Sequence, residues 1–134
     1  MDILGYQFPD SRERWDANWL RIQGRIEHPQ GAWSFEDACL TAFELDILAL
    51  WLVALTTAQG PCKPCWFTEP CLEFHFHPGP HAQIEILFAH EAAPHWLDPA
   101  QKADGFKVGL PLANNPLQAL LVMVDALRQS FPVR

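Results

Sequence analysis

The chain has 134 residues, of which 49% are hydrophobic and 19% charged, and its formal net charge is −7. This length predicts one domain over residues 1–134, and this composition is typical of a folded protein and not of a disordered one. The acidic charge argues against direct binding to nucleic acid, because phosphate recognition requires a basic surface. It suits a basic protein partner, although an acidic surface also simply keeps a protein soluble.

Two further features indicate the compartment. The N-terminal residues lack the basic region and the long apolar run of a signal peptide. The most apolar stretch covers only residues 47–58, whereas a membrane-spanning helix needs about 20 residues. We therefore expect a cytoplasmic protein without a membrane segment, whose four cysteines are reduced thiols.

The N-terminal third is predicted to be mainly strand. Residues 2–8 form a short strand and residues 10–18 a loop. Residues 19–28 alternate between apolar and polar side chains, which indicates a strand with one solvated face. A turn at residues 29–31 then allows residues 32–36 to pair back as a hairpin.

A first helix is predicted to start near Thr41, because Thr41 and Glu44 have the spacing of a capping box, and to end at Gly60. Its leucines recur at helical spacing, yet its other faces are also apolar, which predicts burial on more than one side. A loop, a partner or a second subunit could cover the second side, so a homodimer is one expectation.

The second half is predicted to contain three strands and a helix. The strands are residues 66–77, broken near Pro70, residues 81–90 and residues 106–112, and the first two pair as a hairpin. The helix covers residues 116–130, with Asn115 as its N-cap. The predicted fold class is α+β, with one antiparallel sheet of about five to six strands and two helices packed on one face.

The cysteines and histidines are the strongest candidates for chemistry. Cys62 and Cys65 have the spacing of a zinc-binding pair, and further ligands could come from Cys71, His75, His77 and His81. Because a second pair at zinc-ribbon or finger spacing is absent, we expect no metal and no cofactor, and zinc binding through the Cys62/Cys65 region is a weaker alternative. On a strand, Cys71 would share the outer face with Glu73 and His75.

A second candidate is the row of Glu73, His75 and His77 opposite Glu85. Such a row could bind a metal or transfer protons, but a solvated outer face of a sheet is the favoured interpretation. The sequence also lacks a nucleophile elbow and a phosphate-binding loop. We therefore expect a protein that is not an enzyme.

Several short motifs occur in an order that resembles a known family. They are Asp16-Ala17-Asn18-Trp19-Leu20 with Ile22 and Gly24, Trp33 to Thr41, Glu44-Leu45 with Leu48 and Trp51-Leu52, Phe67 to Pro70 with Leu72 to Phe74, and Phe131 to Arg134. In this order the chain is similar to the bacterial WapI family of immunity proteins. The resemblance implies a small cytoplasmic protein that protects a cell by binding a toxin domain and blocking its active site. It transfers no catalytic residues.

We accordingly expect a non-enzymatic protein-binding domain whose partner is a cognate toxin domain. An uncharacterised homo-oligomeric structural protein is the alternative from another class. Acidic charge would speed association with a basic toxin, and exposed aromatic side chains could anchor the interface. Glu69 could present its carboxylate to the partner, or it could hydrogen-bond a neighbouring loop. The candidate partner-binding residues are Trp15, Asp16, Glu69, Glu73, His75 and Glu85.

Overall fold

The fold combines two antiparallel sheets with three α-helices in the part of the chain that the structure describes. A computed structural model describes residues 1–58, 60–112 and 116–134. The strands are β1 (Asp2–Tyr6), β2 (Trp19–His28), β3 (Gly31–Thr41), β4 (Cys65–Trp66), β5 (Leu72–His77), β6 (Gln83–Phe88) and β7 (Phe106–Pro111). The helices are α1 (Ala42–Thr57), α2 (Pro99–Asp104) and α3 (Pro116–Ser130), with short 3-10 helices η1 (Asp16–Asn18) and η2 (His90–Ala92).

The first sheet has the strand order β1-β2-β3, and the predicted hairpin of β2 and β3 is confirmed. Its apolar alternation is also confirmed, because Leu20, Ile22 and Gly24 are buried while Arg21 and Gln23 are exposed. Gly24 is required here by close packing, since a Cβ atom at this position would lie 2.1 Å from the ring of Phe35. β3 is longer than predicted and runs directly into α1.

The second sheet has the strand order β4-β5-β6-β7. The predicted hairpin of β5 and β6 is confirmed, with Phe74 opposite Ile86 and His75 opposite Glu85. The strand predicted over residues 66–77 is interrupted at Pro70, so that β4 keeps only two residues. The prediction of one sheet of five to six strands was therefore wrong, because the two groups of strands pair only within themselves.

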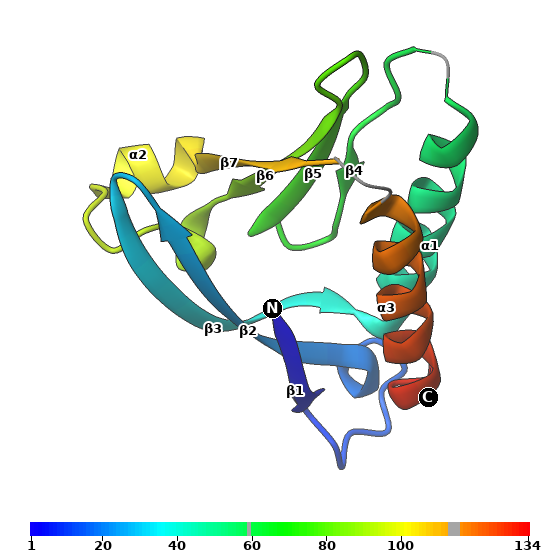
Figure 1. Cartoon of the computed structure of the whole chain (residues 1–134). Coiled ribbons are helices and arrows are strands. Elements are labelled where there is room, and N and C mark those ends of the chain that lie inside the picture. Colours follow the sequence, from blue (N-terminus) through cyan, green and yellow to red (C-terminus); the bar gives the residue numbers. More distant parts are fainter. Residues whose placement is uncertain (59, 113–115) are drawn as a thin grey trace.

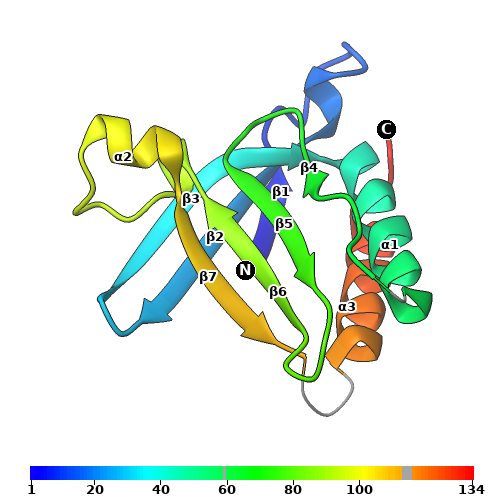
Figure 2. The same ribbon diagram turned by 90° about the horizontal axis from the view of Figure 1, so that it is seen from above.

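The helices do not cover a single face of a sheet, which corrects the second part of that prediction. Figures 1 and 2 show α1 and α3 side by side at one end of both sheets and α2 at the opposite end. The sequence analysis missed α2, whose start is capped by Asp98 and Gln101. The overall α+β class is confirmed. The expected N-cap at Asn115 lies outside the described residues.

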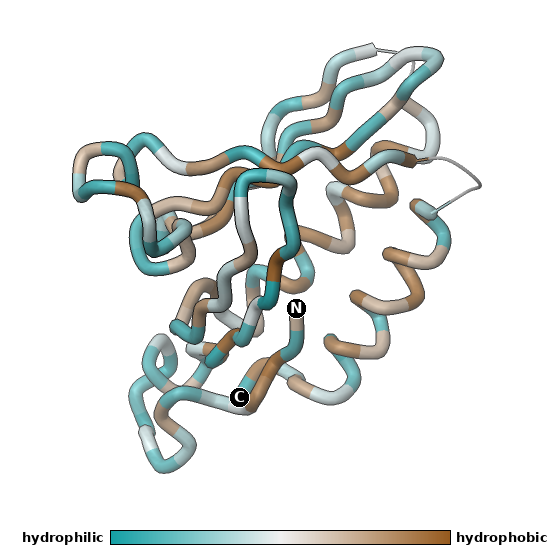
Figure 3. The backbone as a smooth tube through the Cα atoms, turned by 60° about the vertical axis from the view of Figure 1, so that its left-hand side comes forward, coloured by the Kyte–Doolittle hydropathy of each residue, from teal (hydrophilic) through white to brown (hydrophobic). Residues whose placement is uncertain are grey.

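The capping box at the start of α1 is confirmed, and within the single chain one side of this helix is buried while another is open to solvent. Leu45, Leu52 and Leu55 lie in the core, whereas Ile47 and Leu50 point to solvent, and Leu50 is 71% exposed. Figure 3 shows hydrophobic segments recurring along the strands and both long helices. No helix among the described residues is long and apolar enough to cross a membrane.

Candidate functional site

The most distinctive concave site is an acidic pocket next to β3. It has a volume of about 460 Å³, and its lining comes from the end of β1, the start of β2, β3, the residues before β5 and η2. Phe8 and Trp19 supply aromatic surface, while Asp37, Glu69 and Glu91 supply carboxylates. Of the predicted partner-binding residues, the structure places Glu69 in this wall.

A buried thiol lies between two of these carboxylates. The Sγ atom of Cys71 is 4.0 Å from Oδ2 of Asp37 and 3.9 Å from Oε2 of Glu91. The ligand atoms of these three residues all lie within 4.8 Å of one another. Asp37 is half-buried and Glu91 exposed, whereas only 2% of Cys71 is exposed. The expectation that Cys71 would lie on the outer face with Glu73 and His75 was wrong, because Cys71 packs into the core ahead of β5.

A β-bulge shapes this part of β3. Ile22 of β2 pairs with Asp37 and Leu20 pairs with Leu40, so two residues of β3, Ala38 and Cys39, lie opposite one residue of β2. A bulge of this kind redirects side chains and is common beside functional sites. Here Cys39 and Leu40, which are adjacent in sequence, are both buried.

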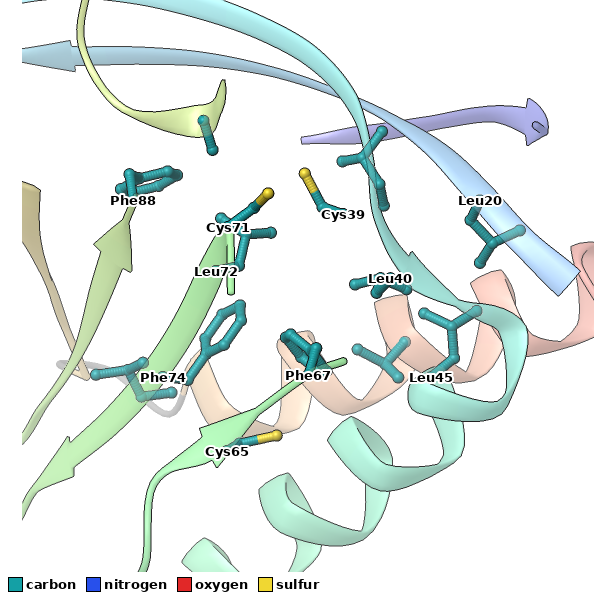
Figure 4. Packing of buried hydrophobic residues seen from close by; sticks show 14 of the residues in the cluster. Leu20, Cys39, Leu40, Leu45, Cys65, Phe67, Cys71, Leu72, Phe74 and Phe88 are labelled. Carbon is teal, nitrogen blue, oxygen red and sulfur yellow. The ribbon is translucent and has the colours of Figure 1, made fainter. Parts of the chain in front are cut away.

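Cys39 is the neighbour of Cys71 inside the core. Figure 4 shows the two sulfur atoms facing each other between β3 and β5, with Cys65 well apart from them. The hydrogen bond with Cys71 and burial both raise the pKa of Cys39, and nearby Asp37 raises it further. The same hydrogen bond lowers the pKa of Cys71, against burial and the adjacent carboxylates. Burial and the adjacent carboxylates thus disfavour negative charge on both thiols.

The carboxylates of the pocket have no basic partner in the described part of the chain. None of the ion pairs found within residues 1–58, 60–112 and 116–134 includes Asp37, Glu69 or Glu91. Asp37 accepts hydrogen bonds from the backbone N–H of Ala38 and from the thiol of Cys71. Glu91 follows His90, which is the one described non-glycine residue with a positive φ, 49°. The pocket thus concentrates negative charge that nothing described in the protein neutralises.

A network at the start of α1 connects the predicted residues Trp15 and Asp16 to the pocket. Trp15 packs edge-on against Phe43, with ring centres 5.5 Å apart. The neighbouring residue Glu44 accepts a hydrogen bond from the backbone N–H of Thr68 at 2.6 Å, which fixes the position of Glu69. Trp15 is 60% exposed and precedes Asp16, which begins η1. Trp15 and the segment that carries Glu69 thus both contact the first turn of α1, and we call Trp15, Asp16 and Glu69 together the α1 corner.

The other three predicted residues form a separate group on β5 and β6. Nε2 of His75 is 3.1 Å from a carboxylate oxygen of Glu73. Glu85 is 3.0 Å from Nζ of Lys107 and 3.7 Å from Nε2 of His77. The hydrogen bond from Lys107 holds the pKa of Glu85 below its usual value. These carboxylates are partly neutralised inside the protein, in contrast to those of the pocket.

Cys62 and Cys65 do not form the zinc site that their spacing suggested. Among the described residues, one group of three or more potential ligands converges, and it contains neither of them. Cys65 is buried, and burial together with nearby Glu44 raises its pKa to about 11. Sequence reasoning missed Asp37, Cys39 and Glu91 because no short spacing connects them to Cys71.

The comparisons with known proteins identify the class of protein. Residues 1–132 match the model of a family of immunity proteins, described as the immunity protein WapI-like family. The chain belongs to this family, which confirms the resemblance found in the sequence. Neither a curated protein nor a solved structure matches the chain.

Proposed function

We propose that this protein is an immunity protein that binds a cognate toxin domain in the cytoplasm and blocks it without catalysing a reaction. The observation that carries the proposal is the family match over residues 1–132. The net charge of −7 supports it, because an acidic surface speeds the encounter with a basic partner.

The toxin-binding surface that we propose is the α1 corner together with the acidic pocket beside it. Trp15 offers an exposed aromatic side chain, which is a typical interface anchor. Asp16 and Glu69 add negative charge around it, and an unpaired carboxylate can accept hydrogen bonds from a lysine or arginine of the toxin without first losing a partner. These features favour a basic segment of the toxin as the contact.

Glu73, His75 and Glu85 remain candidates for a second contact area. A toxin that bound there would have to compete with the pairs Glu73–His75 and Glu85–Lys107. Glu73, His75 and Glu85 are half-buried, and a toxin residue that replaced one of their partners would exchange one pairing for another and gain little net attraction. We therefore place this group second to the α1 corner.

Co-expression with the toxin C-terminal domain encoded beside the gene tests the proposal. The wild-type protein should restore growth and co-purify with the toxin. Trp15→Ala and Glu69→Lys should weaken the complex, since one removes an anchor and the other reverses a charge. Glu27→Lys is the matched control, because Glu27 lies at the exposed end of the β2–β3 hairpin.

Two outcomes would contradict the proposal at different levels. If no toxin is encoded nearby, or if the toxin kills cells that contain the wild-type protein, the immunity function fails. If the complex forms but only Glu73→Lys and Glu85→Lys weaken it, the function stands and the α1 corner is the wrong surface.

One observation favours a second candidate, a homodimer that forms through the helical end. Ile47, Leu50 and Val53 are at least half exposed on α1, and Val122 and Met123 are similarly exposed on α3. Light scattering tests this candidate, because a monomer mass at high protein concentration would exclude it, whereas Leu50→Glu should dissociate a dimer.

A further inference from the structure

We propose that Asp37, Cys71 and Glu91, whose ligand atoms converge, form a zinc site behind the wall of the acidic pocket, with Cys39, which faces Cys71 in the core, as the fourth ligand. The proposal goes beyond toxin binding and does not depend on it. It also differs from the zinc site suggested by the sequence, since it uses neither Cys62 nor Cys65.

The set of side chains has the right chemistry for zinc. Two sulfur and two oxygen ligands make a four-coordinate set, and thiolates select zinc over magnesium or calcium. With Zn–S near 2.3 Å and Zn–O near 2.0 Å, a tetrahedral site separates sulfur from oxygen by about 3.5 Å. The observed separations from the sulfur of Cys71 are 4.0 Å to Asp37 and 3.9 Å to Glu91. The two carboxylates need to move inward by about half an ångström to complete such a site.

The two thiols, unlike the carboxylates, are buried. Cys39 is fully buried and Cys71 is 2% exposed, and their sulfur atoms face each other in the core (Figure 4). Cys71 lies next to Asp37 and Glu91, which keep contact with solvent in the pocket lining and are not paired with any basic side chain of the described residues. A divalent cation would bind the sulfur atoms and supply the positive charge that these carboxylates lack.

The ion can approach from the acidic pocket, whose lining includes Asp37 and Glu91. Glu91 is exposed and Asp37 half-buried, so both can meet the ion before it loses its water shell. As zinc binds, each thiol gives its proton to the solvent and each sulfur donates an electron pair to the metal. Loading therefore releases up to two protons per chain, one from Cys39 and one from Cys71.

Cobalt is a suitable probe because it takes the same tetrahedral ligands and absorbs light. The purified full chain, reduced and free of metal, should bind about one equivalent of Co²⁺ per chain. Its spectrum should show a sulfur-to-cobalt charge-transfer band and the intense visible bands of a tetrahedral ion. Zn²⁺ should displace the cobalt and remove both signals.

Variants assign the ligands. Cys71→Ser and Cys39→Ser should each weaken the charge-transfer band, and Glu91→Gln should weaken zinc binding by about tenfold or more, because even outer-shell losses cost this much. Glu91 is exposed, so its variant should keep the fold even if the buried cysteine variants do not. Glu69→Gln is the matched control, since Glu69 lines the same pocket outside the converging group. Cys62→Ser controls for thiols elsewhere.

Several results would overturn the zinc site. One is a cobalt spectrum without sulfur charge transfer, which would indicate carboxylates alone. Another is an equal loss of affinity in Glu69→Gln and Glu91→Gln, which would indicate only general attraction to an acidic pocket. A mass that reveals a disulfide between Cys39 and Cys71 that persists after treatment with a reductant would also exclude it. Because none of these measurements involves the toxin, failure here leaves the immunity function untouched.

Discussion

Glu44 should be one of the most important single side chains for stability. Only 5% of it is exposed, and it accepts three hydrogen bonds. Its Oε2 accepts from the backbone N–H and the hydroxyl of Thr41, at 2.7 and 3.0 Å, and its Oε1 accepts from the N–H of Thr68. The residue therefore caps α1 and also fastens the segment between β4 and β5 to that helix.

The cost of removing Glu44 can be worked out from these contacts. Hydrogen bonds to a charged group contribute about 1.5–3 kcal/mol each where they are buried, as at Thr41. Those at the more exposed Thr68 contribute about 1 kcal/mol, because water can replace the carboxylate there. Two such bonds at Thr41 and one at Thr68 add to at least about 4 kcal/mol, so we expect Glu44→Ala to lower the free energy of unfolding by about 4 kcal/mol. Glu44→Gln should cost about half as much, since its amide nitrogen cannot accept a hydrogen bond.

Urea denaturation followed by tryptophan fluorescence measures this loss. With a slope of about 2 kcal/mol/M, Glu44→Ala should lower the midpoint by about 2 M at an unchanged slope. Glu36→Ala is the control, because Glu36 forms an exposed ion pair with Arg21 at 3.3 Å, and such pairs contribute about 0–1 kcal/mol. The reasoning is refuted if Glu44→Ala costs no more than Glu36→Ala.

Three further predictions concern packing, charge and the chain ends. Gly24→Ala should destabilise the protein by about 1–3 kcal/mol, because its Cβ atom would overlap the ring of Phe35; an unchanged melting temperature would contradict this. Lys107→Met should reduce stability at about pH 7 but not at about pH 3, since the lowered pKa of Glu85 contributes stability that is lost as the carboxylate is protonated; urea titrations at both pH values test it. Asn18→Ala should cost about 2–3 kcal/mol, because this fully buried side chain makes three hydrogen bonds to backbone groups; an equilibrium denaturation curve equal to that of the wild type would argue against it.

The features that the sequence predicted correctly are local. The alternation of residues 19–28, the capping box of Thr41 and Glu44, and the helix over residues 116–130 each depend on neighbours within a few positions. Preferences that depend only on residues a few positions apart can be predicted from one segment of the sequence at a time. The hairpin of β5 and β6 belongs to the same group, since only a short turn separates its strands.

The division of the strands into two sheets could not be predicted in this way. A strand with one apolar side pairs equally well with any neighbour that shares its pattern, and the choice depends on contacts between distant segments. α1 separates β3 from β4 in the chain, and the two strands end up in different sheets. The sequence analysis merged them because each half shows the same alternation.

The candidate site escaped prediction for a related reason. Asp37, Cys71 and Glu91 are separated by 34 and 20 residues and lie on three different elements, so no spacing motif marks them. The Cys62/Cys65 pair attracted attention because its spacing is short, yet the fold places Cys65 in the core beside Glu44. Spacing predicts a metal site only where the ligands lie on one segment or on a known scaffold.

The pocket brings together side chains whose individual preferences for solvent and for burial differ. Carboxylates favour water and basic partners, and thiols are easily buried, but here Asp37, Cys71 and Glu91 converge next to a bulge in β3, with Cys39 facing Cys71. Sequences generally avoid such conflicts because they lower stability, and those that remain concentrate at functional sites. Zinc behind the pocket wall and a basic toxin segment in the pocket would each offset part of the same negative charge. The contrast between Glu91, in the converging group, and Glu69, in the wall, therefore allows the two functions to be separated by experiment.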